Sequence, residues 1–137
     1  MTNKVERCRM MYNCSVTIIT TADGKKTEIT RAGVLTVSSS VTSVTYEEED
    51  AHVCVRLENG VVMIERTGGY TLFLRLVKGE LTEGTIGISS SQGTVQTKTY
   101  RIAYVKKENA FELSLHYDLL FGEERQNIKI RLYAQEI

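Results

Sequence analysis

Two runs of alternating apolar and polar residues meet at Asn59-Gly60, and this dipeptide constrains the fold more than any other feature of the chain. A type I′ turn needs positive φ at both central residues, so Asn-Gly between two alternating runs is the strongest short-range signal of a β-hairpin. A third alternating run, residues 72–76, follows the glycine pair at 68–69. We therefore expect a three-stranded antiparallel meander over about residues 53–77.

The same alternation, interrupted by short turns, recurs along the chain, and Asp23-Gly24 is predicted to lie at the centre of one such turn. Further strands are predicted at 9–20, 26–38, 41–46, 94–105, 110–121 and 127–134, with one short or irregular strand near 85–89. The segment 110–121 is long enough for a helix, but a helix would spread its period-two apolar residues around the whole circumference, so a strand is favoured. Gly33, inside a strand pattern, predicts a bulge or a tight bend such as a barrel corner.

These elements predict an all-β fold of eight to ten strands without a helix. The connections are too short for parallel crossovers, so the strands follow one another in antiparallel, up-and-down order. The chain has no proline to blunt an exposed edge, whereas closing the sheet into a barrel removes the edges altogether. We expect a barrel first and an open sandwich second. The 137 residues form a single domain, 1–137, in which residues 1–7 are expected to be disordered.

The charge balance argues against two classes of partner. Seventeen basic residues match seventeen acidic ones, and Lys or Arg never exceed two in a row. Nucleic acid and membrane partners are therefore not expected. The acidic run Glu47-Glu48-Glu49-Asp50 is interpreted as a solvated turn, because the ligand spacing of a calcium loop is absent.

The beginning of the chain and its cysteines predict a cytoplasmic location. The first residues lack the apolar core of a signal peptide, and no window reaches the length of a membrane-spanning helix. Three cysteines, an odd number, fit reduced thiols.

Motifs that carry catalysis are missing from the sequence. His52 and His116 are isolated, and His52-x-Cys54 offers only two of the three or four ligands that zinc needs. No serine lies in a nucleophile elbow, and the glycine pairs lack the strand-loop-helix context of a phosphate loop. We expect no metal and no cofactor, and an enzyme is the third-ranked function.

The pattern of strands and turns resembles the YwiB-like family of small bacterial proteins. The residues that carry the resemblance are Tyr46-Glu47-Glu48, Val53-x-Val55-x-Leu57-x-Asn59-Gly60, Ile64-x-Arg66-x-Gly68, Lys78-Gly79-Glu80 and Leu113-x-Leu115-x-Tyr117-x-Leu119-x-x-Gly122-Glu123. The resemblance implies a calycin-like barrel, similar to lipocalins and fatty-acid-binding proteins, in a bacterial cytoplasmic protein. The family is one of unknown function, so it implies no catalytic residues.

A barrel of about this size either fills its interior with side chains or holds one small ligand. Fatty-acid-binding barrels hold a carboxylate with buried arginine and tyrosine, because an arginine fork bonds both oxygens. The candidate ligand-binding residues are Arg66, Arg75, Tyr100, Tyr104 and Tyr117. In the alternative, these arginines point to water and the tyrosines pack at the rim.

Two functions follow from these alternatives. The first is a non-enzymatic barrel that binds a small apolar or amphipathic anionic ligand in its lumen. The second is a filled-core module for protein–protein interaction, or a homodimer, with no small-molecule ligand.

Overall fold

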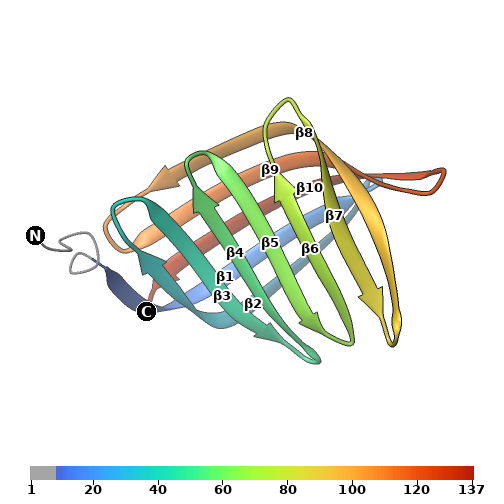
Figure 1. Cartoon of the computed structure of the whole chain (residues 1–137). Helices are drawn as coiled ribbons and strands as arrows, with labels where there is room; N and C mark the ends of the chain where they lie inside the picture. Colours follow the sequence, from blue (N-terminus) through green and yellow to red (C-terminus); the bar gives the residue numbers. More distant parts are fainter. Residues whose placement is uncertain (1–8) are drawn as a thin grey trace, which may run out of the picture.

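Ten antiparallel strands form a closed barrel in the computed structural model, which describes residues 9–137 (Figure 1). The strands are β1 (Met10–Ala22), β2 (Lys25–Val37), β3 (Val41–Glu48), β4 (Ala51–Glu58), β5 (Val61–Gly68), β6 (Tyr70–Leu76), β7 (Leu81–Ile88), β8 (Ser91–Lys106), β9 (Ala110–Phe121) and β10 (Glu124–Glu136). The expected disorder of residues 1–7 lies outside the described residues. The described part contains no helix that is long and apolar enough to cross a membrane.

Each strand pairs with the next one in sequence, and the first pairs with the last. Cys14–Ala22 of β1 lies antiparallel to Ile128–Glu136 of β10, which closes the sheet. This closure confirms the predicted up-and-down barrel and excludes the open sandwich.

The predicted turn chemistry is present at two hairpins. Asn59 and Gly60 have φ values of 53° and 77°, and Asp23 and Gly24 have values of 51° and 85°. Both residues of each pair thus have the positive φ that a type I′ turn requires.

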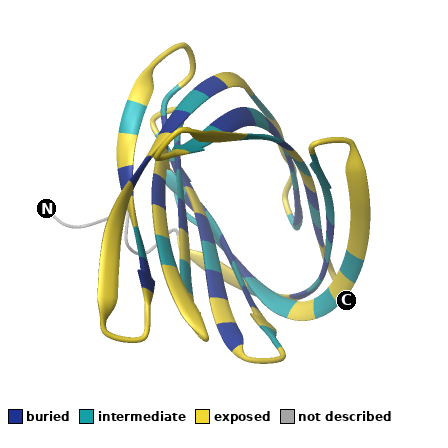
Figure 2. Cartoon of the chain, turned by 90° about the vertical axis from the view of Figure 1, so that its right-hand side faces the viewer, coloured by how far each residue is buried: buried dark blue, intermediate teal, exposed yellow. Residues whose placement is uncertain are grey.

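One end of the barrel is filled and the other is hollow. The filled end carries large inner side chains that are almost completely buried: Leu35, Val62, Leu76, Phe111, Leu113 and Leu132. The hairpins β1–β2, β3–β4, β5–β6, β7–β8 and β9–β10 surround the opposite end, which faces the viewer in Figure 2. We call this second end the open end.

Two strands differ from the sequence prediction. The irregular segment expected near 85–89 is a regular strand, β7, because Gly84 and Gly87 let its backbone lie close to Phe73 and Thr71 of β6. In β8 the register shifts between Thr99 and Arg101, so Tyr100 is an extra residue in a β-bulge.

Gly33 marks the place where β2 leaves β3. These strands pair only from Gly33 to Val37, so residues 25–31 have no neighbour on that side and the barrel wall is open there. A Cβ atom at Gly33 would press against the carbonyl oxygen of Thr45 and lie 2.8 Å from Val16 Cγ2. The predicted barrel corner therefore depends on the absence of a side chain.

We predict that Gly33→Ala lowers the free energy of unfolding by about 2 kcal/mol, because the added methyl group overpacks a backbone crossing. Gly93→Ala is the matched control, since its Cβ would meet only Ile86 Cγ2, at 3.9 Å. The control is expected to raise stability by about 0.5 kcal/mol, because alanine loses less backbone entropy than glycine. Urea unfolding of both variants measures the difference, and equal effects would contradict the close crossing.

Candidate functional site

Arg66 is a charged residue on the inner face of the barrel at its open end. The alternation of β5 buries Val62 and Ile64 and points Arg66 the same way, leaving its side chain only 15% exposed. Its Nη1 donates to Glu48 Oε1 over 2.5 Å, and its Nη2 lies 3.5 Å from Asp50 Oδ1. The guanidinium also covers the ring of Tyr70, 4.3 Å from the ring centre. Its Nε is buried and has no hydrogen-bond partner among the described residues.

The charges and hydroxyl groups around Arg66 are held in defined protonation states. Burial alone would lower the pKa of Arg66, but the hydrogen bond to Glu48 and the neighbouring acids outweigh it and raise that pKa. Burial, aided by the charge of Glu48, raises the pKa of Tyr46 to about 12. Burial also raises the pKa of Tyr117. A cation and neutral phenol groups therefore meet in this part of the lumen.

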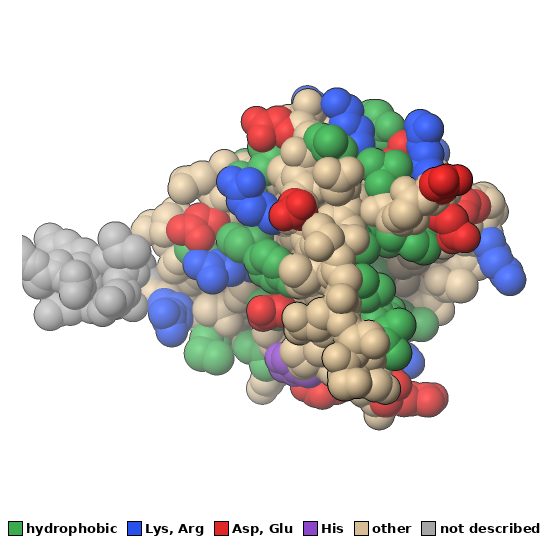
Figure 3. Space-filling view, turned by 45° about the vertical axis from the view of Figure 1, so that its right-hand side comes forward, with side chains coloured by type: hydrophobic (Ala, Val, Ile, Leu, Met, Phe, Trp, Pro, Cys, Tyr) green, Lys and Arg blue, Asp and Glu red, His purple; other side chains and the backbone are tan. Residues whose placement is uncertain are grey.

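Two cavities open into the lumen near Arg66. The smaller, about 210 Å³, is lined by inner side chains of β1–β5, β9 and β10, among them Ile18, Thr27, Ile29, Tyr46, Glu48 and Ile64. The larger, about 510 Å³, is lined by Tyr70, Leu72, Ile86, Ile88, Gly93, Thr94, Val95, Leu119, Phe121 and Gln126. Figure 3 shows hydrophobic side chains around a hollow, with charged side chains at its edge. Arg66 contacts one lining residue of each cavity, Glu48 of the smaller and Tyr70 of the larger.

The five candidate residues from the sequence do not share one cavity. Arg66 and the buried Tyr117 lie on the inner face of the barrel. Arg75 lies on the outer face of β6, and Tyr100 points outward at the bulge. Tyr104, 44% exposed, pairs with Leu113 toward the filled end.

The sequence interpretation missed Tyr46, Glu48 and Tyr70. Glu48 belongs to the acidic run that was interpreted as a solvated turn, yet its side chain is only 26% exposed and pairs with Arg66. The alternation of Val44 and Tyr46, extended by one step, would have placed Glu48 on the inner face.

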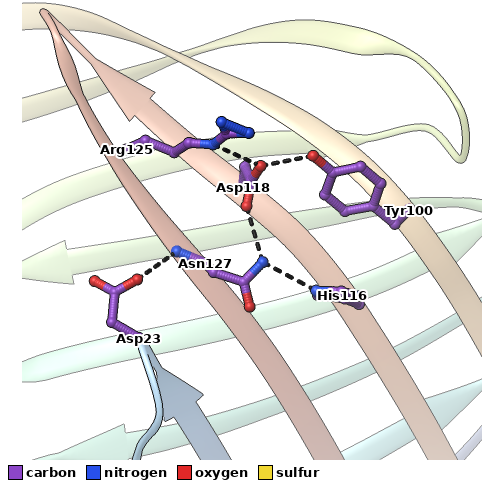
Figure 4. Close-up of a pocket in the computed structure, with 6 residues that line it drawn as sticks. All are labelled: Asp23, Tyr100, His116, Asp118, Arg125 and Asn127. Atoms are coloured by element: carbon purple, nitrogen blue, oxygen red, sulfur yellow. Dashed lines mark hydrogen bonds and ion pairs between the residues drawn. The ribbon is translucent and has the colours of Figure 1, made fainter.

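A second polar cluster lies on the outer face of β8, β9 and β10, around Asp118 (Figure 4). The Asp118 carboxylate is almost completely buried and accepts hydrogen bonds from Tyr100 Oη at 2.6 Å, Arg125 Nε at 3.0 Å and Asn127 Nδ2 at 2.9 Å. Asn127 Nδ2 also lies 3.0 Å from His116 Nε2. Asp23 fixes the backbone of Asn127, whose N–H donates to Asp23 Oδ1 over 2.9 Å. These side chains line a shallow cleft of about 390 Å³.

The Asp118 network stabilises the ionised carboxylate. The hydrogen bond from Tyr100, with those from Asn127 and Arg125, outweighs the effect of burial and lowers the pKa of Asp118. The same hydrogen bond raises the pKa of Tyr100. Asp118 is thus a charged acceptor, and its hydrogen bond with Tyr100 holds the side chain of the extra residue of the β8 bulge in place.

The remaining metal-capable pair does not form a site. His52 contacts Glu47 on the outer face of the barrel, two residues from Cys54. Within residues 9–137, no three His, Cys, Asp or Glu side chains gather closely enough to hold a metal ion.

Asp118→Asn is predicted to change how stability depends on pH. Because the pKa of Asp118 is lower in the folded state, its contribution is complete above the ordinary value of about 3.9 and is lost as the pH falls through the folded value. The wild type should exceed the variant by about 2 kcal/mol at pH 7, and the difference should shrink below about pH 4. Urea unfolding from pH 7 to 2.5 measures it, with Glu28→Gln as an exposed control. A pH-independent difference would contradict the lowered pKa.

The comparisons with known proteins agree with this architecture. Residues 14–132 match the model of a family described as "Domain of unknown function (DUF1934)". The crystal structure of the ywiB protein from Bacillus subtilis superposes with a TM-score of 0.84, covering 96% of this chain and 97% of that chain at 19% sequence identity, which shows a shared fold. No curated protein matches the chain. The resemblance to the YwiB-like family is confirmed, and the chain belongs to the DUF1934 family of antiparallel β-barrels.

Proposed function

We propose that the protein binds a small apolar or amphipathic molecule in the open half of its barrel, without catalysing a reaction on it. The observation that carries the proposal is Arg66, a guanidinium on the inner face that contacts a lining residue of each cavity and has an unpaired Nε donor. Buried donors are almost always satisfied, so an unpaired one beside a cavity suggests a missing acceptor. Free thiols at Cys14 and Cys54 are compatible with a cytoplasmic location for this function.

The larger cavity has the size and the lining of a ligand site. Its volume of about 510 Å³ falls within the range of about 300–1,000 Å³ that is usual for small-molecule pockets. Apolar side chains dominate the lining, while Tyr70, Thr94 and Gln126 add polar groups. Tyr70, Ile88 and Phe121 are each more than a third exposed at its rim. An apolar ligand part in this cavity would remove their surface from water.

Two kinds of polar head group fit beside Arg66. A neutral acceptor can bond its free Nε and leave Glu48 in place. An anionic head group would instead compete with Glu48 for the guanidinium, and Glu48 is exposed enough to turn toward water. In both cases the head lies beside Arg66 and the apolar part extends along Tyr70 into the larger cavity.

Anilinonaphthalene sulfonate, an amphipathic anion, is a direct probe of this site. We expect saturable fluorescence enhancement with the wild type, and about tenfold weaker binding to Arg66→Gln, because a charged hydrogen bond is lost. Arg75→Gln is the matched control, since Arg75 lies on the outer face of the neighbouring strand. Gly93→Phe should abolish binding, because the ring would occupy a cavity in which a Cβ meets only Ile86.

Thermal unfolding of the same variants separates binding from folding. Equal binding to Arg66→Gln and Arg75→Gln, or retained binding to Gly93→Phe, would contradict the proposal. Native mass spectrometry of freshly purified protein then tests for a retained natural ligand. An apo mass together with no probe binding would favour the filled-core interaction module.

Glu48 competes with an anionic ligand for Arg66, so its replacement is predicted to strengthen ligand binding. Glu48→Gln frees Arg66 from its closest carboxylate, so anilinonaphthalene sulfonate should bind more tightly than to the wild type, by about tenfold. The control is Glu58→Gln, which removes the outer-face partner of Arg56 instead. Weaker binding to Glu48→Gln would show that the head group does not lie on Arg66.

A further inference from the structure

A second, independent feature lies on the outer face of β8, β9 and β10. Arg101 of β8 pairs with His116 of β9, which pairs with Lys129 of β10, so the three side chains form one lateral row. Ser114 and Arg131 form the next row. Together these five line a shallow cleft of about 350 Å³ whose lining contains no Asp or Glu. We call it the basic cleft.

The positive charges of the basic cleft are not neutralised by the protein. Among residues 9–137, no ion pair joins Arg101, Lys129 or Arg131 to a carboxylate. Asp118 is bonded by Arg125 and Glu112 by Lys107, while Glu28 is separated from Arg131 by β1 and forms no ion pair with it. Lys129 and Arg131 lie two residues apart on the same face of β10, and Arg101 lies across β9 from them, so these like charges repel one another and the arrangement costs stability unless an anion is bound.

The Asp118 network supplies a neutral donor to the same cleft. Asp118 is an acceptor, so the Asn127 group that faces it must be the Nδ2 amide. The second proton of Nδ2 points to His116 Nε2, so Nε2 is the acceptor and Nδ1 is the donor nitrogen of the ring. His116 and the Ser114 hydroxyl thus add donors to three cations.

We propose that the basic cleft binds the phosphate monoester group of a ligand. A dianion with several oxygens matches three cations and two neutral donors better than a single carboxylate does. Arginine is suited to it, because its planar fork bonds two phosphate oxygens at once. The Arg131 guanidinium lies over the ring of Tyr133, with its Cζ 5.6 Å from the ring centre, and this contact supports one side of the guanidinium. This site is separate from the lumen and does not depend on ligand binding there.

Inorganic phosphate is the first probe, titrated into isotope-labelled protein at constant ionic strength maintained with chloride. We expect saturable NMR shifts at residues 101, 114, 116, 129 and 131, with a Kd on the order of 1 mM. Arg101→Gln/Arg131→Gln should weaken binding at least about tenfold. Arg75→Gln/Lys78→Gln removes two cations elsewhere on the barrel that form no ion pair within residues 9–137, and it should leave binding unchanged.

Further experiments identify the source of the phosphate group and test the role of the Asp118 network. Tighter binding of phenyl phosphate would indicate a soluble monoester, whereas binding only to vesicles that contain phosphatidic acid would indicate a lipid headgroup. Asn127→Asp should weaken phosphate binding, because the new carboxylate adds negative charge beside the cleft, in contact with His116. Non-saturable shifts, or equal binding to both double variants, would overturn the proposal.

Discussion

The pairing of β1 with β10 is the interaction on which the rest of the structure depends. It joins residues more than a hundred positions apart and closes a ten-stranded sheet into a barrel, in which residues 25–31 of β2 still lack a neighbouring strand on one side. Closure gives every strand one inner and one outer face, so the alternation along each strand decides what enters the core. It also pairs the two strands that would be the edges of an open sheet, in a chain that has no proline to block such edges.

Closure by itself does not decide whether the interior is filled or hollow. At the filled end, Phe111 and the leucines of β2, β6, β9 and β10 meet across the barrel and exclude water. At the open end the inner positions include Thr20, Thr27 and Gly93, which are too small to fill the space. The incomplete pairing of β2 with β3 widens this end further. The Arg66–Glu48 pair can lie on the inner face because it is at this open end, where water screens part of its desolvation cost.

The sequence predicted those parts of the structure that depend on local rules. Alternation and turn glycines gave the strand order, the hairpins at Asn59-Gly60 and Asp23-Gly24, and the barrel. The pairing of Arg66 with Glu48 was missed because it joins residues eighteen positions apart, and no local pattern records that contact. The sequence also could not show which end of the barrel is hollow, because that depends on how side chains from non-adjacent strands meet. The outward position of Tyr100, a candidate ligand-binding residue, depends on the register shift in β8, which a simple alternating pattern does not reveal.

The β8 bulge is therefore the clearest case of a local irregularity with consequences beyond its strand. If Tyr100 were paired in a regular ladder and no bulge were present, alternation after Thr99 would send Arg101 into the lumen and Ile102 to the outside. With it, Tyr100 and Arg101 both lie outside and Ile102 returns to the inner face opposite Leu115. Tyr100 then reaches Asp118, which orients Asn127 and through it His116, the residue opposite Arg101. The register shift at the bulge thus keeps Arg101 out of the core and places it in the basic cleft, next to the histidine that Tyr100 helps to orient through Asp118 and Asn127.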